Sequence, residues 1–66
     1  MDPATLEATL KADISEMRDR LDEAAGIAKA ASACAETGYI IKASEIALDV
    51  EQLIYEAHTY MNAATL

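Results

Sequence analysis

The sequence predicts an all-α fold: an antiparallel helical hairpin of two long helices that dimerises into a four-helix bundle. Strong helix formers dominate the 66 residues, which include only two glycines and one proline. Apolar residues recur every three and four positions over most of the chain, as they do in helices that pack like a coiled coil. One strong turn signal, Thr37-Gly38, separates two such stretches.

The first helix is expected over about residues 3–36. Asp2 can cap its free N–H groups, and Pro3 suits the first helical position, where no hydrogen-bond donor is needed. From Leu10 onward, steps of four and three alternate to give one apolar seam: Leu10, Ile14, Met17, Leu21, Ala24, Ala28, Ala31 and Ala35. A break at Gly26 is the main alternative to one continuous helix.

The turn is expected at about residues 37–39, because Gly38 can take the left-handed conformation that ends a helix. The second helix is expected over about residues 40–62. A helix with one neighbour needs only a narrow apolar stripe, whereas this helix is apolar on a wide arc, which predicts at least two neighbours. The arc consists of three heptad rows and a partial fourth: Tyr39, Ile46, Leu53 and Tyr60; Ile40, Ala47, Ile54 and Met61; Ala43, Val50, Ala57 and Ala64; and Ile41, Leu48 and Tyr55.

Since one hairpin gives each helix a single neighbour, the wide arc favours a homodimer or a separate protein partner. We expect residues 1–66 to form one small domain that gains stability by assembly. The residues expected at the interface are large apolar side chains of both helices: Leu10, Ile14, Met17, Leu21, Ile46, Val50, Leu53, Ile54 and Met61.

Few side chains could take part in catalysis or metal binding, and a structural role is the favoured interpretation for each of them. His58 has no nucleophile or carboxylate three or four residues away, so a surface or interface histidine is expected. Cys34 stands among alanines and is expected to pack as a small apolar residue, with a redox role left open. One cysteine and one histidine can form neither an intrachain disulfide nor a Cys/His zinc site. We therefore expect no enzyme activity and no cofactor.

One dense carboxylate cluster is the exception. It comprises Glu16, Asp19, Asp22 and Glu23. This spacing can bind Mg²⁺, so a Mg-dependent all-α enzyme is the least favoured alternative. Such a site needs carboxylates on the facing helix, but Glu45 and Asp49 lie nearer the turn. Because Arg18 and Arg20 interrupt the cluster, a solvated helix face is the favoured interpretation.

The charge balance narrows the class of partner. Twelve acidic and five basic residues give a net charge of −7, which disfavours DNA, RNA and anionic membranes. A single cysteine is typical of a reducing compartment, so a cytoplasmic location is expected. The sequence therefore predicts a protein–protein interaction module, an adaptor, chaperone or regulator, that acts through apolar helix faces as a homodimer. The alternative is an obligate small subunit that completes a partner protein's helical bundle.

Overall fold

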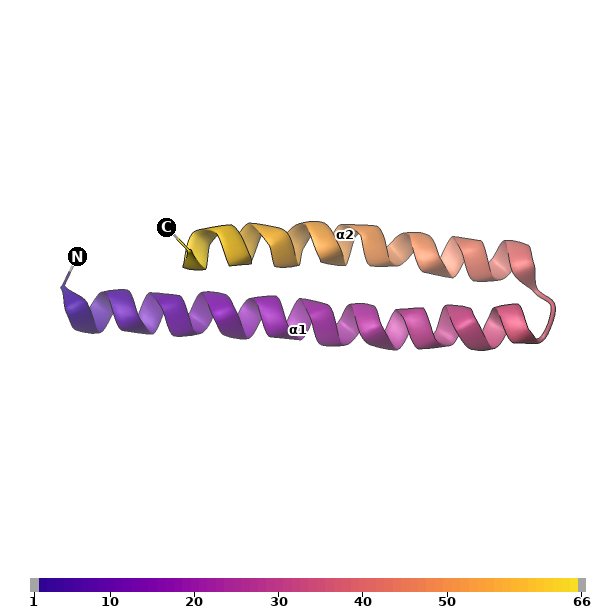
Figure 1. Cartoon of the computed structure of the whole chain (residues 1–66), viewed down its shortest axis with the longest axis horizontal. Coiled ribbons are helices and arrows are strands. Elements are labelled where there is room, and N and C mark those ends of the chain that lie inside the picture. The colour runs from indigo at the N-terminus through magenta and orange to yellow at the C-terminus, as the bar shows by residue number, and fades with distance from the viewer. Residues whose placement is uncertain (1, 66) are drawn as a thin grey trace.

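The computed structural model describes residues 2–65, which form two antiparallel helices. Helix α1 spans Pro3–Glu36 and helix α2 spans Ile40–Ala64, and the two lie side by side with α1 extending beyond the end of α2 (Figure 1). The predicted all-α helical hairpin is confirmed. Its extents of 54, 14 and 10 Å are those of a single layer of two helices, so residues 2–65 leave both broad faces of the hairpin uncovered.

Helix α1 begins at a side-chain cap. The Asp2 carboxylate accepts a hydrogen bond from the backbone N–H of Thr5 at 2.9 Å and another from the Thr5 hydroxyl at 2.7 Å. These bonds satisfy a free donor of the first turn, and they lower the pKa of Asp2 because they favour the charged carboxylate. Pro3 follows in the first turn, and the helix then runs through Gly26 without a break.

A Schellman motif ends α1 and reverses the chain. Gly38 has a φ of 91°, a left-handed conformation that glycine adopts without steric cost. The N–H of Gly38 donates to the carbonyl of Ala35 at 3.0 Å. The N–H of Tyr39 donates to the carbonyl of Cys34 at 3.2 Å, which completes the bond pair that defines this motif. Helix α2 therefore starts directly after the turn.

Small residues dominate the contact between the helices. Alanine side chains let two helix axes approach closely. The buried side chains are Ala24, Ala31, Ala43, Leu53 and Ala57. Half-buried apolar side chains extend the contact along both helices: Leu10, Met17, Ile27, Ile46, Val50 and Tyr60. No large side chain of residues 2–65 is fully buried, so the hairpin has a thin core.

The predicted seam of α1 is wrong on one side. One of its two rows, which we call the shared row, faces α2 as expected: Leu10 and Met17 are half-buried, and Ala24 and Ala31 are buried. In the row expected beside it, Ile14, Leu21 and Ala28 are exposed instead, and Ala35 next to the turn is half-buried. The row on the other side of the shared row takes its place, with half-buried Asp13, Arg20 and Ile27. Helix α1 is therefore rotated about its axis relative to the prediction.

Arg20 lies in this contact because its charge is paired there. Its guanidinium nitrogens are 3.1 Å from the Glu16 carboxylate and 3.5 Å from the Glu56 carboxylate on α2. The guanidinium carbon also lies 5.6 Å from the centre of the Tyr60 ring, within cation–π range. Desolvation acts to lower the pKa of Arg20, but Glu16, Tyr60 and Glu56 together outweigh it. The pKa is therefore raised, and Arg20 keeps its charge. Its aliphatic stem can meanwhile cover apolar neighbours.

The two glycines are expected to respond in opposite ways to alanine. Gly26 is exposed within α1 and has open space where a Cβ would stand, so Gly26→Ala should stabilise the fold by about 1 kcal/mol. Gly38 has open space too, but its left-handed φ makes Gly38→Ala cost about 1–2 kcal/mol. Thermal melting followed by circular dichroism measures both, at roughly 4–8 °C per kcal/mol. A Gly38→Ala variant that melts no lower than the parent would contradict the turn described here.

Candidate functional site

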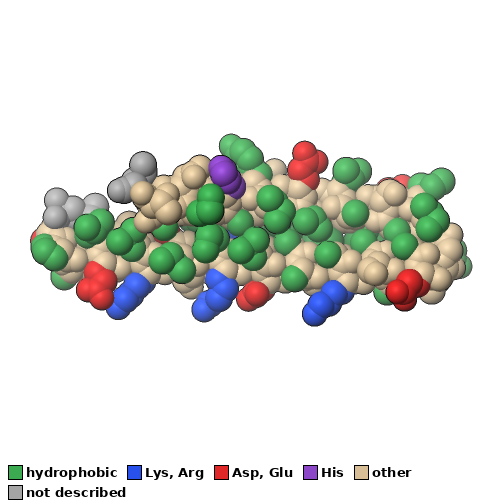
Figure 2. All heavy atoms as spheres, viewed as in Figure 1, with side chains coloured by type: hydrophobic (Ala, Val, Ile, Leu, Met, Phe, Trp, Pro, Cys, Tyr) green, Lys and Arg blue, Asp and Glu red, His purple; other side chains and the backbone are tan. Residues whose placement is uncertain are grey.

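One broad face of the hairpin carries exposed apolar side chains from both helices. Ile14 and Leu21 of α1 are 51% and 43% exposed, and Ile54 and Met61 of α2 are 48% and 40% exposed. Leu21, Ile54 and Met61 line one groove, which places the two rows on the same side of the molecule. Figure 2 shows apolar side chains along the junction between the helices over much of its length. We call this surface the apolar face.

The groove in the apolar face lies between the middle of α1 and the C-terminal half of α2. It is lined by Met17, Leu21, Ile54, Ala57, His58 and Met61. Methionine side chains are flexible and polarizable, so they can adapt to the shape of an apolar partner. The groove is therefore suited to receive apolar side chains from another helix.

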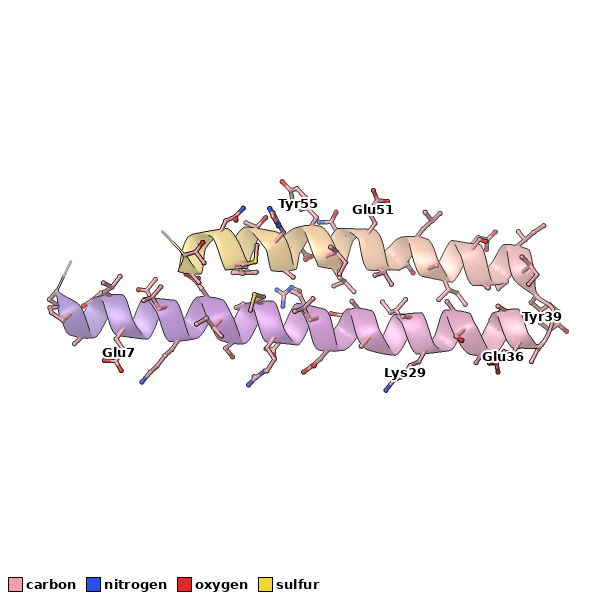
Figure 3. All side chains as sticks on the ribbon, in the orientation of Figure 1. Glu7, Lys29, Glu36, Tyr39, Glu51 and Tyr55 are labelled. Carbon is pink, nitrogen blue, oxygen red and sulfur yellow. The ribbon has the colours of Figure 1, made fainter. Side chains whose placement is uncertain are left out.

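Charges of both signs border the apolar face along α1. Glu7, Lys29 and Glu36 point away from α2 (Figure 3). Lys11 forms an ion pair with Glu7 at 3.0 Å, but both side chains are largely exposed, so the pair adds little stability. An apolar centre with a polar, charged rim is the usual anatomy of a protein–protein interface.

The solvent-accessible surface is large for the mass of the protein. It measures 4882 Å², whereas a compact monomer of 7.1 kDa would expose about 4,100 Å². The difference, roughly 800 Å², is close to the area that each partner buries in a standard protein–protein interface. The excess follows from the single-layer shape, which leaves both broad faces of the hairpin exposed.

The residues expected at the interface divide into two groups. Those between α1 and α2 are buried Leu53 and half-buried Leu10, Met17, Ile46 and Val50. Those on the apolar face are Ile14, Leu21, Ile54 and Met61. The hairpin thus brings the first group together internally and leaves the second group exposed. For α2 it provides one of the two neighbours that the wide apolar arc predicts.

The predicted carboxylate cluster is a set of solvated and paired charges. Glu16 pairs with Arg20, and Asp19 pairs with Arg18 at 3.1 Å. Within residues 2–65, no three His, Cys, Asp or Glu side chains come together in a way that could hold a metal ion.

The histidine and the cysteine lie apart from each other. His58 is exposed at the edge of the groove, and Figure 2 shows this histidine in purple beside the apolar side chains. Cys34 is half-buried near the turn, where its thiol donates to the carbonyl of Tyr39 at 3.6 Å. The position of Cys34 favours a packing role, and His58 is a surface histidine as expected.

Neither helix, over the described residues, combines the length and apolar character needed to cross a membrane. Comparison with protein-family models, curated proteins and solved structures finds no match to this chain. Function is therefore inferred from the surfaces of the hairpin itself.

Proposed function

We propose that this protein is a non-enzymatic interaction module that works as a homodimer. Two hairpins would pack their apolar faces together into an antiparallel four-helix bundle, whose outer surfaces engage another protein as an adaptor, chaperone or regulator. The observation that carries the proposal is the apolar face, with Leu21, Ile54 and Met61 exposed around one groove. Contiguous exposed apolar patches are uncommon on monomeric proteins and often mark interaction sites.

Burial of the apolar face would supply the driving force for assembly. Each Å² of apolar surface removed from water stabilises by about 25 cal/mol. Within residues 2–65 the hairpin buries one large side chain, Leu53, so its internal contact alone contributes little compared with larger domains. Folding and association are therefore expected to be coupled, with stability that rises with protein concentration.

A second copy of the chain suits the apolar face for two reasons. The rim of this face has mixed charges, including Lys11, Arg18 and Glu7, so two copies can meet without uniform repulsion. The face is also bulky at Leu21 and small at Ala28, nearer the turn. A copy reversed end to end would set bulky residues against small ones, which fills space well in a symmetric interface.

Charge and cysteine content support the rest of the proposal. The net charge of −7 argues against nucleic acid or an anionic membrane as the partner. The free Cys34 fits a reducing compartment, and we propose a cytoplasmic location.

The oligomeric state tests this proposal. We expect the parent protein to be a dimer at micromolar concentration by sedimentation equilibrium. The double variant Leu21→Glu/Ile54→Glu is expected to be monomeric, because a dimer would have to bury unpaired carboxylates at the centre of its interface. Both positions are exposed in the hairpin, so the substitutions leave the contact between α1 and α2 intact.

Leu48→Glu is the matched control, since Leu48 is 67% exposed on α2 outside the apolar face. This variant should remain a dimer. A parent that stays folded and monomeric would contradict the homodimer, and a monomeric, poorly folded parent would favour the obligate-subunit alternative. Loss of the dimer in Leu48→Glu alone would place the interface elsewhere on α2.

A further inference from the structure

A second apolar row on α2 lies outside both the hairpin contact and the apolar face. It consists of Ile41, Leu48 and Tyr55, which we call the outer row and which are 79%, 67% and 68% exposed. Figure 3 shows Tyr55 pointing away from α1. Because the members are seven residues apart, close to two helical turns, they share one side of α2. A bundle formed through the apolar face would leave this row on its outside.

Acidic residues flank the outer row on both sides. Glu45 and Glu51 are exposed on opposite edges of the row, and Figure 3 shows Glu51 projecting away from α1. Lys42 is the one Lys or Arg of α2, and its ammonium lies 3.7 Å from the Glu45 carboxylate in a largely exposed pair. From residue 43 to residue 65 the chain has no Lys or Arg. The charges that flank the outer row are therefore mainly negative.

We propose that the outer row is a docking site for an amphipathic helix of another protein, with apolar residues at heptad spacing and Lys or Arg along its flanks. The inference rests on the proposed role as an interaction module and names its surface and its kind of partner. Helices dock on one another through such apolar rows, and basic flanks would face Glu45 and Glu51. From Ile41 to Tyr55 the row is about 21 Å long, which corresponds to about four helical turns of a partner.

The acidic flanks of the outer row disfavour two other occupants, a second copy of the chain and an anionic membrane. A second copy of α2 would bring its own Glu45 and Glu51 to the contact, where like charges would oppose each other. An anionic membrane surface would be repelled for the same reason. The outer row thus differs from the apolar face, whose rim has charges of both signs.

Two synthetic helical peptides test the docking site. Both have leucines at heptad positions, and one has lysines on its flanks where the other has glutamates. Fluorescence anisotropy with the full chain should show the lysine peptide binding about tenfold tighter or more, with an affinity that falls as salt rises. Leu48→Ser/Tyr55→Ser should weaken binding of the lysine peptide about tenfold or more and leave the oligomeric state unchanged.

Ala30→Ser is the control, because Ala30 is exposed on α1, away from both the outer row and the apolar face. This variant should bind the lysine peptide like the parent. Charge reversal in Glu45→Lys/Glu51→Lys should invert the preference between the peptides. Equal binding of the two peptides, or full binding by Leu48→Ser/Tyr55→Ser, would overturn the inference.

The oligomeric state of the same samples separates this inference from the proposed homodimer. If Leu48→Ser/Tyr55→Ser loses the dimer, the outer row is a contact between copies and the docking inference fails. If the parent is monomeric yet binds the lysine peptide through the outer row, the homodimer fails and the docking site stands.

Discussion

Replacing Leu53 with alanine is expected to cost about 2–5 kcal/mol of stability, the largest loss for a single truncation in this protein. Leu53 is 9% exposed and is the one large side chain buried between α1 and α2 within residues 2–65. Its removal would leave a cavity between the helices, and the surrounding structure would relax only partly to fill it. Since small domains have total stabilities of about 5–15 kcal/mol, the variant should melt roughly 10 °C or more below the parent.

The neighbouring variant Ile54→Ala separates internal packing from assembly. Ile54 is 48% exposed in the hairpin, so its truncation should weaken the dimer more than the hairpin. Thermal melting at two protein concentrations a hundredfold apart makes the distinction. Leu53→Ala should melt low at both concentrations, whereas the effect of Ile54→Ala should appear mainly at the high concentration.

Glu51→Ala serves as the solvent-exposed reference in the same melts, and it should change little. If Leu53→Ala melts like the parent, the contact between α1 and α2 is not the one described. An Ile54→Ala variant that melts like the parent at both concentrations would show that no second neighbour covers this side of α2.

Enlarging a buried alanine is the second change with a large expected effect. Ala24 is 5% exposed where α1 meets α2, so Ala24→Leu should push the helices apart and cost about 1–3 kcal/mol. Ala30→Leu makes the same substitution at an exposed position of α1 and should be nearly neutral. Urea unfolding of the two variants gives the difference in free energy. Equal stability of the two would mean that the helices do not approach closely at Ala24.

The helices and the turn could be predicted because their signals act over a few residues. Asp2 bonds to Thr5 within the first turn of α1, and Gly38 ends that helix through bonds to the residues just before it. Intrinsic helix propensity is also a local signal, and it agrees with the helical conformation of the stretch around Gly26. Such local rules need no knowledge of what the helix packs against.

The rotation of α1 about its axis could not be predicted in this way. Ile14 and Leu21 have heptad spacing beside the shared row, and so do Asp13 and Arg20 on its other side. Hydrophobicity favours the first pair for the contact. Two partners of Arg20, Glu56 and Tyr60, lie on α2, and spacing within α1 gives no sign of them.

The same limit applies to the candidate site. The width of the apolar arc predicted two neighbours for α2, but adjacent residues such as Leu53 and Ile54 could not be assigned to one neighbour or the other. That assignment depends on which side of α2 meets α1. Once α1 is placed, the exposed Ile14 and Leu21 join Ile54 to form the apolar face.

The Schellman turn at Gly38 also has a consequence for the order of folding. Cys34 and Tyr39 are bonded within the turn, and the buried Ala31 and Ala43 lie only slightly farther along the two helices. Each further contact therefore closes a loop only a little longer than the one before, and loop-closure entropy rises slowly with loop length. Chains with such local contacts fold fast. The contacts of the hairpin can therefore form in order, from Gly38 toward the free ends of the helices. In the proposed dimer, the rate of assembly is then limited by the encounter of two molecules and not by the folding of each one.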